Sequence, residues 1–255
     1  MNKNNIKITA YHKCGSTILH GIFRHVCMVH KYNFMTEDTK KEGPLPATIS
    51  LSRVPHAGPI DSETRYIQIL RHPLSRLISQ YYSYGWTHEP PSTSIAPEKE
   101  INEFREMQAW VRTISLDEYV IRNIELKMHP FARDLNRRQG ENILVLPYEL
   151  LITDYISFFK EIEKHTGITN LESTVAARFH DEFQPQPDLS DNIINNNLKT
   201  HKRTTDIYEY KSKLNHDLLN QNLPLKVKLV LEAYDDLLKN YNLYEFDSSY
   251  QKYRD

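Results

Sequence analysis

A short apolar strand, a tight polar loop and an amphipathic helix open the chain, and this order constrains its fold more than any other feature. The strand begins at Ile6, residues 12–17 read His-Lys-Cys-Gly-Ser-Thr, and apolar side chains then recur at helical spacing to about residue 30. Backbone N–H groups at a helix start carry partial positive charge and point out of the helix. With a lysine and two hydroxyls beside them, they predict a binding site for an anion, such as a nucleotide phosphate.

Strands and helices alternate along the rest of the chain. Strands are predicted at 48–52, 66–70 and 143–146, and helices at 74–82, 98–113, 115–138, 155–166 and 225–239. Polar segments at 31–47, 85–97 and 185–206 are predicted as turns and loops, the last with partial disorder. This alternation predicts an α/β fold of three layers, with a mainly parallel central sheet flanked by helices.

Ligands of such sheets bind at the carboxyl ends of the strands. The loops at residues 12–17, 71–73 and 147–149 each follow a predicted strand. We therefore expect these three loops to share one edge of the sheet.

Composition bounds the functional class. The 255 residues carry a formal net charge of −1, which gives no global attraction to nucleic acid or to a membrane surface. We expect one domain over residues 1–255, with any anion site local. The N-terminal residues lack the apolar segment of a secretion signal, and no apolar run is long enough to span a membrane, so a soluble cytoplasmic protein is expected. Cys14 and Cys27 are expected to be free thiols.

The loop is not a Walker A sequence, because Lys13 precedes the glycine and no earlier glycine stands where that motif requires one. Lys-x-Gly-Ser-Thr after a first strand instead resembles the phosphosulfate-binding loop of sulfotransferases that use 3'-phosphoadenosine 5'-phosphosulfate (PAPS). The resemblance implies a fold similar to that of P-loop NTPases. It also implies cofactor contacts from the loop residues Lys13, Cys14, Gly15, Ser16 and Thr17.

A second motif follows the strand at 66–70. Arg71 stands at its end, Pro73 comes two residues later and Ser79 eight residues after the arginine, which resembles the 3'-phosphate motif of the same family. A guanidinium offers a planar fork to a phosphate, and a serine hydroxyl can donate one more hydrogen bond. Arg76 is a possible third contact, although a place on a solvated helix face is the simpler interpretation.

Two further matches lie later in the chain. The strand ending at Pro147-Tyr148-Glu149-Leu150 is similar to a family strand that ends in Tyr-Glu-Asp-Leu, with Leu150 in place of the aspartate. The resemblance implies that Tyr148 lies near the adenine. Lys202 and Arg203 resemble the basic C-terminal loop that closes on the 3'-phosphate, without its usual Arg-Lys-Gly. Ile18 stands where the family has an aromatic residue, so adenine stacking from that position is not expected.

Sulfuryl transfer requires positioning and charge neutralisation, and no metal is expected. Lys13 is the predicted catalyst, because its ammonium would neutralise charge on the departing 5'-phosphate. The acceptor must lose a proton, and His56 is the leading candidate base, with His20 second and Glu37 a distant third.

The predicted reaction is sulfuryl transfer from PAPS to a hydroxyl, or to an amine or guanidine-type nitrogen, of a small-molecule acceptor. The acceptor's identity and the oligomeric state stay open. Two alternatives remain: a nucleotide-binding module without catalysis, which the presence of Lys13 disfavours, and an atypical small-molecule kinase, which the lack of a recognisable magnesium pattern disfavours.

Overall fold

The computed structural model describes residues 5–36, 47–54, 60–91, 93–94, 96–136, 142–180, 211 and 213–243. The chain divides into two compact units. The first unit contains residues 1–72, 129–184 and 230–248, and the second contains residues 73–128, 185–229 and 249–255.

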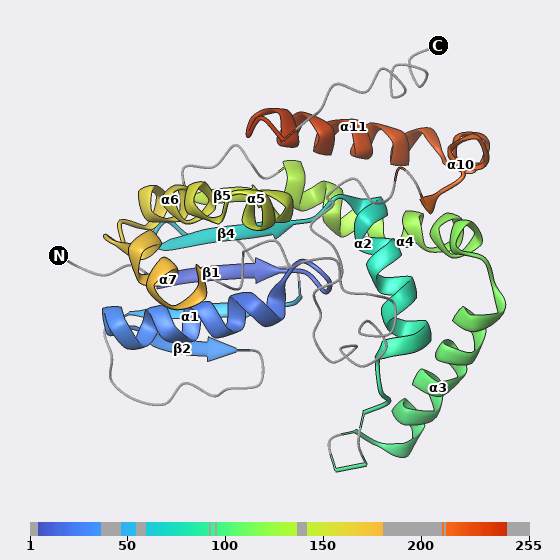
Figure 1. Ribbon diagram of the computed structural model, residues 1–255, viewed down its shortest axis with the longest axis horizontal. Coiled ribbons are helices and arrows are strands. Elements are labelled where there is room, and N and C mark those ends of the chain that lie inside the picture. The colour runs from blue at the N-terminus through green and yellow to red at the C-terminus, as the bar shows by residue number, and fades with distance from the viewer. Residues whose placement is uncertain are drawn as a thin grey trace. The chain divides into compact units, whose positions relative to one another are not determined.

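A five-stranded parallel sheet forms the centre of the first unit. Its strands are β1 (Asn5–Ala10), β2 (Asn33–Thr36), β3 (Thr48–Ser52), β4 (Thr64–Leu70) and β5 (Ile143–Pro147). Their order across the sheet is β2-β3-β1-β4-β5, and every neighbouring pair is parallel. Figure 1 shows β1 and β4 side by side with their arrowheads at the same end. The predicted α/β class with a parallel sheet is confirmed.

Helices cover both faces of this sheet. Successive side chains of a strand point to opposite faces, so each strand contributes residues to the apolar clusters on both faces. Ile67, Ile69 and Leu146 pack in one apolar cluster with helices α1 (Ser16–His30), α5 (Tyr148–Thr153), α6 (Tyr155–Thr166) and α7 (Leu171–Phe179). The alternate residues Leu70 and Val145 pack in another cluster with the ends of α4 (Leu116–Asn136) and α11 (Leu225–Lys239). Strands buried on both faces explain the near-continuous apolar runs of β4 and β5.

Helix α6 begins and ends at the predicted residues, 155 and 166. Asp154 caps its start, accepting a hydrogen bond of 3.0 Å from the backbone N–H of Ser157. Gly167 ends it with a φ of 74°, in the left-handed conformation that glycine adopts without strain.

The described residues of the second unit are mainly helical. The unit contains α2 (Pro73–Tyr82), a π-helical turn η1 (Ser83–Thr87), α3 (Glu98–Thr113), α10 (His216–Asn222) and the first parts of α4 and α11. The π turn falls partly within the predicted loop at 85–97. Side chains of α3 hold it, since Arg112 Nε donates to the Gly85 carbonyl over 2.6 Å and Gln108 Nε2 donates to the Tyr84 carbonyl over 3.1 Å. Because side chains of another helix hold the turn, its own sequence shows no helical periodicity of apolar residues.

Among the helices and strands of the described residues, the sequence prediction missed β2, α5, α7 and α10. Each has nine residues or fewer, too short for apolar periodicity to stand out. The predicted polar segment at 185–206 lies outside the described residues. Among the described helices, none is long and apolar enough to cross a membrane.

Candidate anion site

The loop between β1 and α1 is a tight turn with two residues in the left-handed conformation. The backbone N–H of Cys14 donates to the Tyr11 carbonyl over 2.9 Å and closes the turn. Lys13 has a φ of 68° and Gly15 a φ of 77°. A left-handed lysine is unusual, and such strain tends to occur at functional sites, where the surrounding structure maintains it.

The start of α1 meets the physical requirements of an anion site. Its N-cap residue is Gly15, which has no side chain to accept a hydrogen bond, and its first turn carries no acidic residue. The first N–H groups of a helix have no partner within the helix, and they favour a negative charge in front of them. Ser16 is buried and Thr17 is exposed. Backbone donors of the helix and the hydroxyl of Thr17 are therefore suited to a phosphate.

Gly15 is sterically required where it stands. A Cβ atom at this position would lie 2.6 Å from Cε2 of Tyr148, closer than real Cβ contacts come, and the φ of 77° would strain any other residue. The absence of a side chain lets the Tyr148 ring, at the start of α5, lie directly against the loop.

Arg71 joins the loops that follow β1, β4 and β5. Its guanidinium Nη1 donates to the Lys13 carbonyl over 3.1 Å, and the guanidinium carbon lies 5.1 Å from the centre of the Tyr148 ring. Burial raises the pKa of Tyr148, and the nearby Arg71 charge opposes that rise. The expectation that these three loops share one edge is confirmed, because β1, β4 and β5 are parallel neighbours.

A buried carboxylate, that of Glu149, forms hydrogen bonds at this edge of the sheet. The Glu149 carboxylate, 2% exposed, accepts the backbone N–H of His72 over 2.9 Å and the Tyr234 hydroxyl over 2.6 Å. His72 Nε2 lies 3.5 Å from a carboxylate oxygen of Asp235. None of these side chains is predicted as functional from the sequence, although Glu149 lies in the predicted loop at 147–149 and Tyr234 on the helix predicted at 225–239.

The remaining candidate residues that the structure describes lie on helices α1 and α2. His20, on α1, packs against Phe34 of β2, with ring centres 5.1 Å apart. Ser79 is half-buried on α2, in the second unit. Arg76, also on α2, is 9% exposed, so its predicted place on a solvated helix face is wrong. Burial, and then the nearby Tyr84, raise the pKa of Tyr119, and the Arg76 charge lies close enough to oppose that rise.

Four candidate residues lie outside the described part of the chain: His56, Glu37, Lys202 and Arg203. Their assignments as base candidates and as 3'-phosphate ligands stay predictions.

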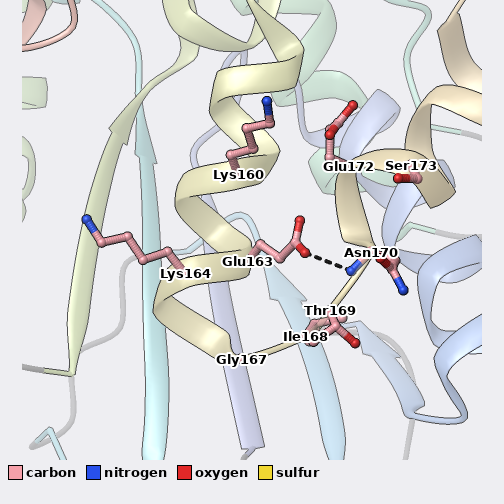
Figure 2. A pocket seen from close by; sticks show the side chains of 9 residues that line it. All are labelled: Lys160, Glu163, Lys164, Gly167, Ile168, Thr169, Asn170, Glu172 and Ser173. Carbon is pink, nitrogen blue, oxygen red and sulfur yellow. Dashed lines mark hydrogen bonds between the residues drawn. The ribbon is translucent and has the colours of Figure 1, made fainter.

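A surface hollow of about 500 Å³ lies elsewhere in the first unit, at the turn between α6 and α7. Figure 2 shows Lys164 directed away from Asn170, and Glu163 bonded to the Asn170 backbone N–H. The adjacent His165 interacts with the backbones of Asn142 and Tyr66, at the amino ends of β5 and β4. This hollow is therefore at the edge opposite to the β1–α1 loop, and its polar side chains do not converge. Within the described residues, no group of three or more His, Cys, Asp or Glu side chains could hold a metal ion.

The first unit is thus a parallel α/β unit, and the candidate anion loop lies at the carboxyl edge of its sheet. No protein-family model matches the sequence, and no curated protein matches it. Among solved structures, the mouse sulfotransferase SULT7A1 in complex with PAP is similar to this chain with a TM-score of 0.46 and 15% identity, over 94% of this chain and 86% of that one. This likeness is remote and identifies neither activity nor substrate.

Proposed function

We propose that the chain is a PAPS-dependent sulfotransferase acting on a small-molecule acceptor. The observation that carries the proposal is the meeting of Lys13, Gly15, Arg71 and Tyr148 at one edge of the sheet, in front of an α1 start without an acidic residue. The sequence shares two features with PAPS enzymes and not with Walker A proteins. The loop lysine precedes the glycine, and an arginine follows the strand that pairs with β1.

The proposed reaction is an in-line displacement. A bond forms between sulfur and the acceptor oxygen or nitrogen, and the bond between sulfur and the 5'-phosphate oxygen breaks, releasing adenosine 3',5'-bisphosphate (PAP). The Lys13 ammonium neutralises charge developing on that oxygen, and the α1 backbone N–H groups bind the phosphate. A histidine takes the acceptor proton, for which His56 is the first candidate and His20 the second.

Arg71, Ser79, Lys202 and Arg203 are the proposed 3'-phosphate ligands. Tyr148 is proposed to contact the adenine, since its ring already borders the loop at Gly15. An aromatic face can stack on a base, and the Tyr148 ring also packs against the apolar cluster of the first unit.

Thermal stabilisation by two nucleotides tests the proposal. PAP should raise the melting temperature of the wild-type protein more than ATP with magnesium does, because only PAP places phosphates at both ends of one ribose for Lys13 and Arg71. Greater stabilisation by ATP with magnesium would favour a kinase and overturn the proposal.

Incubation with labelled PAPS then identifies the acceptor. Alcohols, phenols, amines, guanidines and sugars form the panel, and transfer of label to one class is the expected result. If PAP binds but no member of a broad panel is labelled, the chain is a nucleotide-binding module without catalysis.

A further inference from the structure

A buried chain of hydrogen bonds connects helix α11 to the residue that follows Arg71. The Tyr234 hydroxyl, on α11, lies 2.9 Å from the Leu70 carbonyl and 2.6 Å from Glu149 Oε2. The other Glu149 oxygen accepts the backbone N–H of His72 over 2.9 Å. Tyr234 is fully buried, and its pKa is raised well above the usual range by burial first, with further contributions from Glu149.

These bonds bracket Arg71 on both sides. Leu70 precedes it and His72 follows it, and both backbone groups are held by the Glu149 and Tyr234 side chains. Glu149 also follows Tyr148, the residue whose ring lies against Gly15 and beneath the Arg71 guanidinium. One carboxylate therefore sets the separation between the strand end that carries Arg71 and the strand end that carries Tyr148.

The polar atoms are costly to leave unpaired. Glu149 is 2% exposed and Tyr234 is 0% exposed, so neither can exchange its partner for bulk water. The single proton of the Tyr234 hydroxyl faces two acceptors, Leu70 O and Glu149 Oε2. Because two buried acceptors share this proton, displacement of either strand end would weaken a buried hydrogen bond.

We propose that Glu149 and Tyr234 are positioning residues of the anion site, which hold Arg71 and Tyr148 in the geometry that binds the nucleotide. Neither side chain is proposed to contact the nucleotide. The proposal rests on the proposed function for the identity of the ligand, and on the hydrogen bonds alone for the positioning of Arg71.

Four substitutions separate positioning from general stability. Glu149→Leu has similar size but cannot accept a hydrogen bond, and Tyr234→Phe removes only the hydroxyl. Glu149→Gln is the conservative control, because its amide oxygen can accept the His72 N–H while its NH₂ donates to the Tyr234 oxygen. Tyr155→Phe is the matched control for a lost phenol bond, because Tyr155 is buried in the same unit, on helix α6, and its hydroxyl bonds His180 Nδ1 over 2.7 Å.

Calorimetry with PAP gives the first readout. Glu149→Leu and Tyr234→Phe should each weaken PAP binding about tenfold, since a misplaced Arg71 forfeits the equivalent of one hydrogen bond to a charged group, whereas Glu149→Gln and Tyr155→Phe should bind as the wild type does. The variants are compared well below their melting temperatures. A purely structural role would lower those temperatures and leave the PAP affinity of the folded protein unchanged, which would overturn the proposal.

The Arg71 side-chain Nε–H resonance gives a readout that needs no nucleotide, and its absence in Arg71→Lys assigns it. It should move in Glu149→Leu and Tyr234→Phe and stay in place in Tyr155→Phe. An unmoved resonance in a folded Tyr234→Phe overturns the positioning, even if Glu149→Leu fails to fold. A wild-type protein that does not bind PAP, in which the resonance still moves in these variants, overturns the proposed function and leaves the positioning intact.

Discussion

Lys13 adopts a backbone conformation that costs a lysine about 1 kcal/mol, with a φ of 68°. The Arg71 bond to its carbonyl helps to hold it there. Such a cost at the start of α1 is explained if the position of the Lys13 ammonium is needed for function.

Lys13→Ala should therefore lose activity without losing the fold. We expect kcat for sulfuryl transfer to fall about 100-fold or more, as when a charge-stabilising donor is removed, and PAP affinity to fall as well. Lys31→Ala is the matched control, because Lys31 is also a left-handed lysine, with a φ of 56°, at the opposite end of α1. Steady-state kinetics of both variants provide the measurement. Wild-type rates in Lys13→Ala would exclude the proposed catalytic role.

Gly15 and Gly167 form a second matched pair at this scale. Both are left-handed, but a Cβ at Gly15 would collide with Tyr148 and one at Gly167 would meet nothing within 4 Å. Gly167→Ala should cost about 1 kcal/mol of unfolding free energy from backbone strain alone. Gly15→Ala should cost more and should also weaken PAP binding, because Tyr148 must move. Denaturant titration and calorimetry measure the two effects. Equal costs would show that the ring yields without penalty.

At the scale of the element, helix α6 depends on its capping residue. Asp154 accepts the Ser157 N–H at the start of the helix. Partial burial tends to raise the Asp154 pKa. The hydrogen bonds from Ser157 and the positive charge of the nearby Lys160 have the opposite effect, and the net shift of the pKa is downward.

Asp154→Ala should lower the free energy of unfolding by about 1 kcal/mol near neutral pH. A carboxyl whose folded pKa is lowered contributes stability above its unfolded value, and that contribution is lost as pH falls through the folded value. The difference between wild type and variant should thus shrink below about pH 4, the ordinary aspartate range. Asp154→Asn keeps the acceptor and removes the charge, so it should retain most of the stability. Urea titrations over this pH range provide the measurement. A difference independent of pH would exclude the charged cap.

At the scale of the whole molecule, the two cysteines report on the cores of the first unit. Cys27 belongs to the cluster on one face of the sheet and Cys14 to the cluster on the other face, and both are buried free thiols. Burial raises the pKa of Cys27 to about 12. The expectation of free thiols is confirmed for this structure.

Neither thiol should react with a disulfide reagent at about pH 8 in the native protein, because thiolate forms only on exposure. Unfolding in denaturant should expose two reactive equivalents, one from each cysteine. The measurement is the amount of coloured thiolate that the reagent releases per protein before and after denaturation. Rapid native labelling of Cys14, compared with a Cys14→Ser variant, would show that the β1–α1 loop opens independently of the core.

The sequence alone determined the elements whose signals are local. Apolar periodicity located α1, α2 and α11, and the helix predicted at 155–166 agrees with α6 at both ends. The order of strand and helix determined the parallel sheet, and with it the shared edge of the loops after β1, β4 and β5. Lys13, Gly15, Arg71 and Tyr148 were proposed because the motifs after three strands resemble those of PAPS-dependent sulfotransferases.

Only the tertiary structure decided which side chains those loops contact. Glu149 and Tyr234 are 85 positions apart, yet they share a hydrogen bond of 2.6 Å that no local pattern encodes. The Gly15 requirement has the same origin, because the Tyr148 ring that demands it comes from another strand end. Local propensity acts through neighbouring residues, whereas burial of polar groups acts through partners that folding brings together. The chain therefore specifies its anion loop locally and the support of that loop globally.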